Sequence, residues 1–245
     1  MAPAKLPLLL ILGVIGLTPV AADTLIVMTN INEGSAALGE PSEQTTSRTW
    51  LAGKKIRQDE GEQSVIVDLE HKKAFVLNHE SKSYHAFDLP VDLSQLIPEA
   101  QRAQFEQALA RMAMNVSVTP TDETAEVRGF ASKKYLIEMK HPEGLQMHAE
   151  YWTTEQIDLD ISQYKALILE IASLQPGVSH WMKKILEIRG FPVKRVTTIE
   201  MMGHQVVSRE ELSAVETRPA PDGHYRPPAD YEATPLDLSA PTSGS

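Results

Sequence analysis

The 245-residue sequence contains no cysteine. This absence excludes disulfide bonds, catalytic thiols and zinc sites built from thiolates. It also excludes the lipid-modified cysteine by which bacterial lipoproteins are anchored. An exported domain without disulfides must rely on its hydrophobic core and hydrogen bonds, which fits a bacterial periplasm better than a eukaryotic secreted module.

Basic residues are scarce relative to acidic ones. The chain has 23 Lys and Arg against 33 Asp and Glu, which gives a formal net charge of −10. This balance opposes binding to phosphate backbones or anionic lipid surfaces, so we expect no nucleic-acid partner. Long hydrophobic runs are also lacking, because the stretch LPLLLILGVIGL (residues 6–17) is shorter than the roughly 20 residues of a membrane-spanning helix.

The hydrophobic run has the form of a secretory signal peptide. Lys5 precedes it, and the small residues that follow predict cleavage after Ala22. We therefore predict a signal peptide over residues 1–22, a single domain over 23–233 and a disordered tail over 234–245. The mature chain would then lie in the bacterial periplasm or outside the cell, without a transmembrane segment.

The central sequence predicts an α+β fold. Short β-type segments alternate with the polar breaks DEGE, EHKK and ESKS, which is typical of an antiparallel meander. Helical periodicity appears at residues 98–114, 162–173 and 178–188. We expect a curved antiparallel β-sheet, an unclosed half-barrel, that is covered on its concave face by helices.

The stretch HESKSYHAFDLP (residues 79–90) concentrates side chains that could form a Ser/His/Asp nucleophile or a histidine metal site. With a turn at Ser81-Lys82, strand alternation sends His85 away from both His79 and Asp88. A catalytic triad needs its acid against the histidine, and no G-x-S-x-G motif is present. The stretch is therefore interpreted as a turn and a strand, and no enzyme activity is predicted.

The same reasoning predicts the pairing of the meander. It places Val76 opposite Phe87, and a turn at His71-Lys72 places Val67 opposite Val76. One face then collects Val65, Val67, Leu69, Ala74, Val76, Asn78, His85, Phe87 and Leu89. The other face collects Ile66, Asp68, Phe75, Leu77, His79, Tyr84, Ala86 and Asp88.

Methionine and histidine offer a weaker metal hypothesis. Residues 201–204 (MMGH), with Met147 and His148, could supply soft ligands to copper. The favoured interpretation is a hairpin turn with core methionines. We predict no metal site and no cofactor.

Both faces of the meander are apolar, so each needs a cover. An interface between a sheet and helices is either a packed core or a cavity for a hydrophobic ligand such as a lipid. The residues predicted to line such a cavity are Trp50, Val65, Val67, Val76, Phe87, Phe105, Leu109, Met112, Leu167 and Trp181.

The order of several short motifs resembles an uncharacterised family of exported bacterial domains, domain of unknown function 4412, with the lipoprotein-carrier (LolA/LolB-like) fold. The matching residues are Trp50, Gly53, Lys55, Arg57, Ile66, Val67, Asp68, Lys82, Ser83 and Tyr84, followed by Gly129, Phe130, Lys134, Tyr135 and Trp152. The resemblance covers about residues 46–233. It implies an unclosed barrel lidded by helices, whose cavity binds lipoprotein acyl chains in the carriers themselves. The chain lacks the carriers' aromatic–arginine segment and has additional helical sequence at 160–188.

The leading functional hypothesis is a soluble, non-enzymatic periplasmic protein that binds a lipid or another hydrophobic ligand between sheet and helices. A second hypothesis is an envelope scaffold with a solid core and an exposed apolar patch around Tyr225, Pro228 and Tyr231. A third is an exported hydrolase or metal protein, which predicts polar side chains converging in a cleft.

Overall fold

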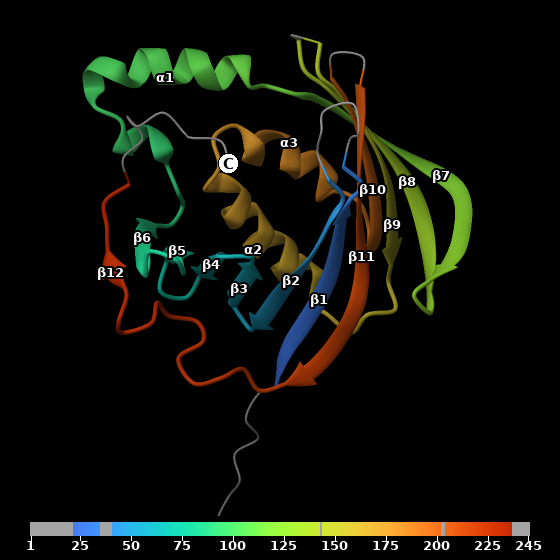
Figure 1. Cartoon of the computed structure of the whole chain (residues 1–245), viewed down its shortest axis with the longest axis horizontal. Helices are drawn as coiled ribbons and strands as arrows, with labels where there is room; N and C mark the ends of the chain where they lie inside the picture. Colours follow the sequence, from blue (N-terminus) through green and yellow to red (C-terminus); the bar gives the residue numbers. More distant parts are fainter. Residues whose placement is uncertain (1–21, 35–40, 143, 202–203, 237–245) are drawn as a thin grey trace, which may run out of the picture.

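The fold is described from a computed structural model that covers residues 22–34, 41–142, 144–201 and 204–236. Most of the predicted signal peptide and residues 237–245 of the predicted tail lie outside these ranges. Within them, twelve strands form one sheet that does not close, with helices on its concave side (Figure 1). The predicted α+β half-barrel is confirmed.

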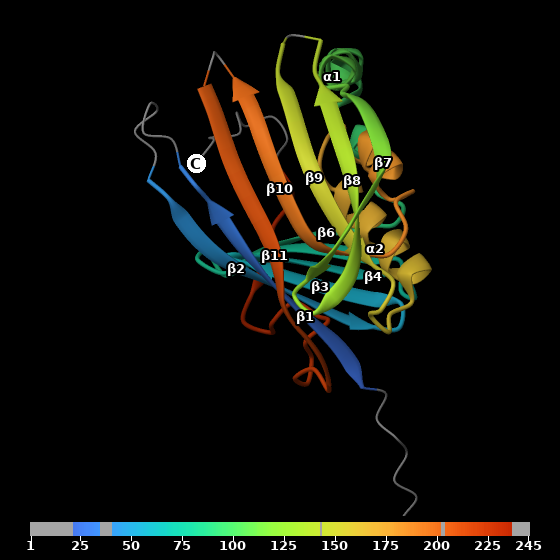
Figure 2. The same cartoon turned by 90° about the vertical axis from the view of Figure 1, so that its right-hand side faces the viewer.

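The sheet has the order β12-β6-β5-β4-β3-β2-β1-β11-β10-β9-β8-β7. Its strands are β1 (Asp23–Asn32), β2 (Glu43–Ala52), β3 (Lys55–Glu60), β4 (Gln63–Asp68), β5 (Lys73–Asn78), β6 (Ser83–Asp88), β7 (Asn115–Val127), β8 (Phe130–Lys140), β9 (Gln146–Thr154), β10 (Phe191–Met201), β11 (His204–Arg218) and β12 (Glu232–Ala233). Every neighbouring pair is antiparallel except β12 and β6, which are parallel. Figure 2 shows the long strands β8–β11 rising steeply from the flatter layer of β2–β6.

The helices are η1 (Leu93–Leu96), α1 (Glu99–Arg111), α2 (Ile161–Ser173) and α3 (Val178–Ile185). The last three lie close to the predicted ranges, whereas η1 was not predicted. Asp160 starts α2 because its side chain accepts a hydrogen bond from the Gln163 backbone N–H at 2.9 Å. α2 then crosses the concave face, and α3 turns back toward β7 (Figure 1). No helix in the described ranges is long and apolar enough to cross a membrane.

The core consists of two clusters, one under α2 and one under α3. The main core lies under α2 and contains Ile26, Met28, Leu51, Ile56, Val67, Ala74, Phe87, Leu93, Ile157, Leu167, Phe191, Val193 and Leu212. A smaller cluster under α3 is built on Ile137, Met139 and Ile188. Apolar side chains of one strand face therefore pack against two helices in succession.

The predicted face assignment is correct, but the predicted register is wrong by two residues. Val76 pairs with Val65 and His85, whereas Val67 and Phe87 both lie beside Ala74. A shift of two residues keeps every side chain on its face. The predicted division of residues between the two faces of the meander is therefore correct despite the wrong register.

Side-chain hydrogen bonds explain the register. Asp68 Oδ1 accepts from the backbone N–H groups of Glu70 and His71, and Asn78 Oδ1 accepts from that of Ser81. These Asx turns start both loops early. Lys72 and Lys82 close them with positive φ angles of 53° and 49°. Each loop is therefore four residues long.

Candidate functional site

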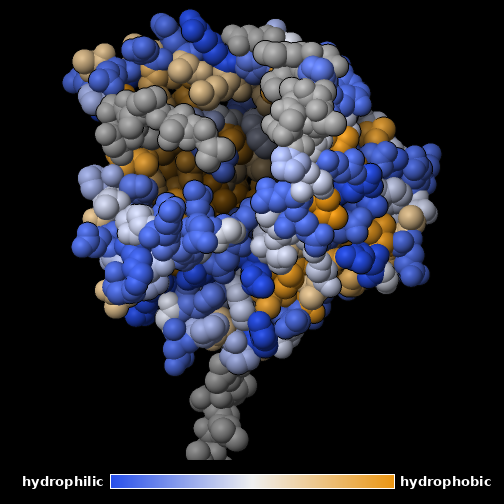
Figure 3. Space-filling view, viewed as in Figure 1, coloured by the Kyte–Doolittle hydropathy of each residue, from blue (hydrophilic) through white to orange (hydrophobic). Residues whose placement is uncertain are grey.

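A hollow opens on the concave side below α1, and its deep wall is hydrophobic (Figure 3). α1 crosses above this hollow, yet none of its residues is buried. Partly buried apolar side chains that pack against the main core from the surrounding elements are Val65, Val76, Leu89, Phe105, Ile168, Ile171 and Leu174. The core thus continues into a surface that α1 covers only in part, through Phe105.

A cavity of about 620 Å³ adds a polar wall to the concave side. Val65 and Ile171 line this cavity and also pack against the main core, so the apolar and polar regions are continuous. Its polar lining includes Asn30, Thr45, Ser47, Gln58, Glu60, Gln175, Arg195 and Glu210. An apolar floor beside hydrogen-bonding groups can hold a molecule with a hydrophobic body and a polar end.

Two of the charged groups of this wall, Arg195 and Glu210, form an ion pair. Arg195 contacts Glu210 at 2.5 Å, with side chains 47% and 27% exposed, and Asn30 donates to Glu60 at 2.9 Å. The Arg195 side chain is only partly removed from water; this partial burial opposes its charge, but the Glu210 carboxylate and neighbouring tyrosines outweigh it and raise the pKa of Arg195. Burial also raises the pKa of Tyr151, beside Arg195 on β9, to about 12. The wall therefore presents a neutralised ion pair.

The convex face is covered by residues 219–231, which we call the C-terminal strap. The strap is fixed by Arg57, which donates to the His224 carbonyl at 3.0 Å, and by Tyr231, whose hydroxyl lies 2.7 Å from His79 Nδ1. Beyond the strap, the Thr234 backbone N–H donates to the Tyr84 carbonyl at 2.9 Å. The cover that the apolar outer face requires is thus the chain's own C-terminal segment.

A polar network under the strap includes the first histidine of HESKSYHAFDLP. Ser64 donates to Asp59 Oδ1 at 2.5 Å and lies 2.6 Å from His79 Nε2. Because the Ser64 proton goes to Asp59, His79 donates from Nε2 and accepts the Tyr231 hydroxyl at Nδ1. Ser64 is 1% exposed, so a substrate cannot reach its hydroxyl. This serine–histidine contact ties the strap to the sheet.

Strap attachment leads to a prediction for Tyr231. Tyr231→Phe removes the hydroxyl that bonds His79, so it should lower the free energy of unfolding by about 0.5–1.5 kcal/mol and speed protease cleavage within the strap. Tyr84→Phe is the matched control, since no hydrogen bond of its hydroxyl occurs within the described part of the chain. Urea unfolding and limited proteolysis measure both effects. Equal behaviour of the two variants would show that the network does not hold the strap.

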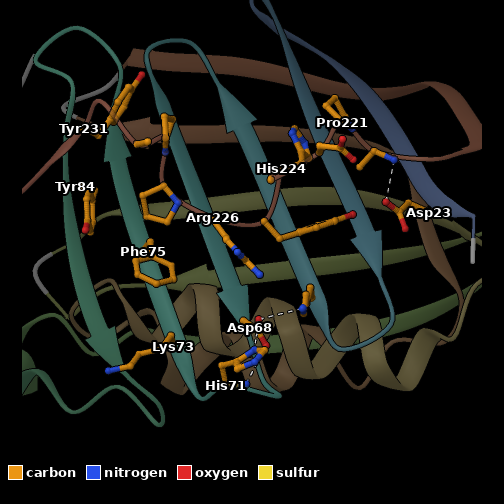
Figure 4. A pocket seen from close by; sticks show the side chains of 18 residues that line it. Asp23, Asp68, His71, Lys73, Phe75, Tyr84, Pro221, His224, Arg226 and Tyr231 are labelled. Carbon is orange, nitrogen blue, oxygen red and sulfur yellow. Dashed lines mark hydrogen bonds and ion pairs between the residues drawn. The ribbon is translucent and has the colours of Figure 1, made fainter. Parts of the chain in front are cut away.

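A second cavity, of about 900 Å³, lies between the strap and the convex face (Figure 4). At one end Asp68 accepts from His71 Nδ1 at 2.8 Å and lies 3.4 Å from Lys55 Nζ. Burial works against the charge of Asp68, but hydrogen bonds from His71 and the charge of Lys55 outweigh it and lower the pKa of Asp68. Asp68, Glu70 and His71 are close enough to hold a metal ion. The Lys55 ammonium already supplies positive charge there.

The residues predicted to line a ligand cavity fall into several environments. Val65, Val76 and Phe105 are partly buried on the concave side, while Val67, Phe87 and Leu167 are buried inside the main core. On α1 and at its end, Leu109 is partly buried and Met112 is 51% exposed. Trp181 lies on α3 and packs against the second cluster. The structure thus brings only part of the set to the hollow.

Trp50 lies on the opposite face from the one predicted. It pairs with Leu25 and Arg57, and its ring lies 5.0 Å from that of His224 in the strap. The concave residue of this part of β2 is its neighbour Leu51. Alternation along β2 decides this, because one residue in the chain changes the face.

The expected apolar patch of the scaffold hypothesis is not a free surface. Tyr225, Pro228 and Tyr231 are all partly buried in the strap. In the copper hypothesis, Met147 packs in the cluster under α3, whereas residues 202 and 203 lie outside the described ranges. His148 is paired across the sheet with Thr198 and Glu138.

Sequence reasoning missed the strap and its network. Strand alternation places Ser64 on the same face as Ile66 and His79. The contact between Ser64 and His79 could therefore have been predicted from the sequence. The partner Tyr231 was not, since 152 positions separate it from His79.

An unclosed sheet with helices on its concave side is the half-barrel architecture that the sequence predicts. The chain belongs to the family "Domain of unknown function (DUF4412)", whose model matches residues 41–231. No curated protein matches the chain.

Solved structures show weak similarity. PNGF-II, in its C2 and P21 crystal forms, is 13% identical with TM-scores of 0.43 and 0.39. The matches cover 89% and 82% of this chain, which spans about a third of PNGF-II (32% and 29%). A putative outer membrane lipoprotein-sorting protein domain from Vibrio parahaemolyticus is 6% identical with a TM-score of 0.30, covering 82% of this chain and 87% of that one.

Proposed function

We propose that this protein binds a lipid or another hydrophobic molecule in the concave hollow and does not catalyse a reaction on it. The observation that carries the proposal is the apolar floor below α1, which the described residues leave open, and α1 itself buries none of its own residues. Apolar surface left accessible inside a concavity favours an apolar occupant, because water is released from both surfaces.

The polar wall supports a ligand with a hydrogen-bonding end. Arg195 is paired with Glu210 and Glu60 with Asn30, so the wall offers dipoles and paired charges beside the apolar floor. A non-enzymatic role is supported by the same pairing, since these groups are engaged with one another. Export from the cytoplasm is supported by the signal-peptide pattern of residues 1–22.

Filling the hollow tests the proposal. Val65→Trp places a large ring where Val65 borders both the apolar floor and the polar wall. The wild-type protein, purified from bacterial cells, should release lipid on extraction and show the bound mass in native mass spectrometry. The variant should retain much less lipid and bind a fluorescent fatty acid about tenfold more weakly, which corresponds to about 1.4 kcal/mol.

Leu136→Trp is the matched control. Leu136 lies on β8 and is 40% exposed, so the same ring added there leaves the hollow unchanged and lipid retention should equal that of the wild type. Thermal unfolding of both variants checks that they are folded. A wild-type protein that carries no lipid and binds the fatty acid no better than Val65→Trp would refute the proposal.

A further inference from the structure

The C-terminal strap forms an arch between two anchored ends. At one end Arg57 donates to the His224 carbonyl, and at the other Lys82 bonds Asp230 at 2.9 Å. Between these anchors, residues 226–229 make no hydrogen bond to the sheet in the described structure. Pro227 and Pro228 fix two φ angles and stiffen this span. The arch is therefore held open over the convex face and does not lie flat on it.

The space under the arch has the size of a small-molecule site. Its volume is about 900 Å³, within the range of about 300–1,000 Å³ that is common for ligand pockets. Phe75 and Tyr84 form an aromatic floor, with ring centroids 5.9 Å apart in an edge-to-face arrangement. Both rings are only partly buried, so they offer a surface for another flat group.

Arg226 supplies a charge that is directed into this space. Its side chain projects from the arch toward the gap between Phe75 and Asp68 (Figure 4). Of the lysines and arginines that line the cavity, it alone has no carboxylate partner within the described part of the chain. A guanidinium presents several N–H donors in a planar fork that matches carboxylate and phosphate oxygens.

Of the acidic residues that line the cavity, Asp23, Asp68 and Asp222, none forms an ion pair with Arg226 in the described part of the chain. Lys55 and His71 already engage Asp68. Asp23 accepts from the Ala220 backbone N–H at 3.0 Å and lies at the far end of the cavity from Phe75 (Figure 4). Lys73 pairs with Asp88, which is 85% exposed, and such exposed pairs are weak. Lys73 can therefore add a second positive group.

We propose that the cavity under the arch binds a small aromatic anion. Its carboxylate, phosphate or sulfate group pairs with Arg226, and its ring rests on Phe75 and Tyr84. This site lies on the face of the sheet opposite the concave hollow, so it is distinct from the proposed lipid site.

Titration calorimetry with phenyl phosphate and benzoate tests the site in the full-length protein. Both probes should bind the wild type, and binding should weaken as salt is added. Arg226→Gln should reduce their affinity about tenfold or more, while Arg111→Gln, on exposed α1, should leave it unchanged. Inorganic phosphate and phenol should each bind at least tenfold more weakly than phenyl phosphate, because each lacks one of the two recognised groups.

Val65→Trp separates this proposal from the lipid hypothesis, since it should leave phenyl phosphate binding intact. Circular dichroism confirms that each variant is folded. The proposal is overturned if neither aromatic anion binds, if Arg226→Gln binds them as tightly as the wild type, or if Val65→Trp rather than Arg226→Gln abolishes binding.

Discussion

Replacing Gly190 by alanine should destabilise this protein far more than the same change at Gly129. The two glycines have nearly the same backbone conformation, with φ angles of +82° and +84°. A side chain in this region costs about 1–2 kcal/mol. At Gly129 the added Cβ meets nothing within 4 Å, so this backbone term is the whole expected effect.

At Gly190 the added Cβ would lie 2.5 Å from the carbonyl oxygen and 2.9 Å from the carbonyl carbon of Thr154. Thr154 is buried and pairs with Phe191 where β9 meets β10, so its backbone has little room to move. Overpacking of this kind adds about 1–3 kcal/mol. Urea unfolding of both variants measures the difference. Equal losses would mean that the β9–β10 junction adjusts freely.

Truncating Leu167 should remove about 2–5 kcal/mol from the free energy of unfolding. Leu167 is 0% exposed at the centre of α2 and packs in the main core. Leu167→Ala therefore loses buried methyl groups and leaves a cavity that its neighbours fill only in part. The sequence predicted a ligand contact for this residue, whereas its burial predicts that it anchors α2 to the sheet.

Leu136→Ala is the control for this change. It removes the same atoms from a residue that is 40% exposed on β8, so the loss should stay within about 0.5 kcal/mol. Chemical unfolding provides the comparison, and a similar cost at both positions would contradict the core assignment. An unchanged stability of Leu167→Ala together with lost lipid binding would return Leu167 to the ligand site.

Local patterns predicted the elements well. Alternation gave the two faces of the meander from Val65 to Leu89, and helical periodicity located α1, α2 and α3 within a few residues. These predictions succeed because they depend on neighbours in the chain. The predicted register was wrong because the Asx turns of Asp68 and Asn78 start each loop earlier than expected. In addition, the residue with positive φ in each loop is a lysine and not a glycine, so the sequence did not mark its position.

The candidate sites depended on distant contacts. The apolar character of Val65, Val76 and Phe105 was enough to select them as candidate lining residues. The sequence did not show that Leu167 is buried in the main core or that Trp50 lies on the convex face. The stretch HESKSYHAFDLP supplies His79 to a network whose other members come from β3, β4 and the strap.

The sequence by itself determined the class of fold, the segments that become strands and helices, and the need to cover both faces of an apolar sheet. The tertiary structure alone decided what covers them, with α2 and α3 on the concave side and the C-terminal strap on the convex side. It also decided that α1 stands over an open hollow and that Arg226 projects beneath an arch. The physical reason is that a residue is buried by segments that lie over a hundred positions away in the sequence. Local periodicity carries no information about which distant segment packs against it.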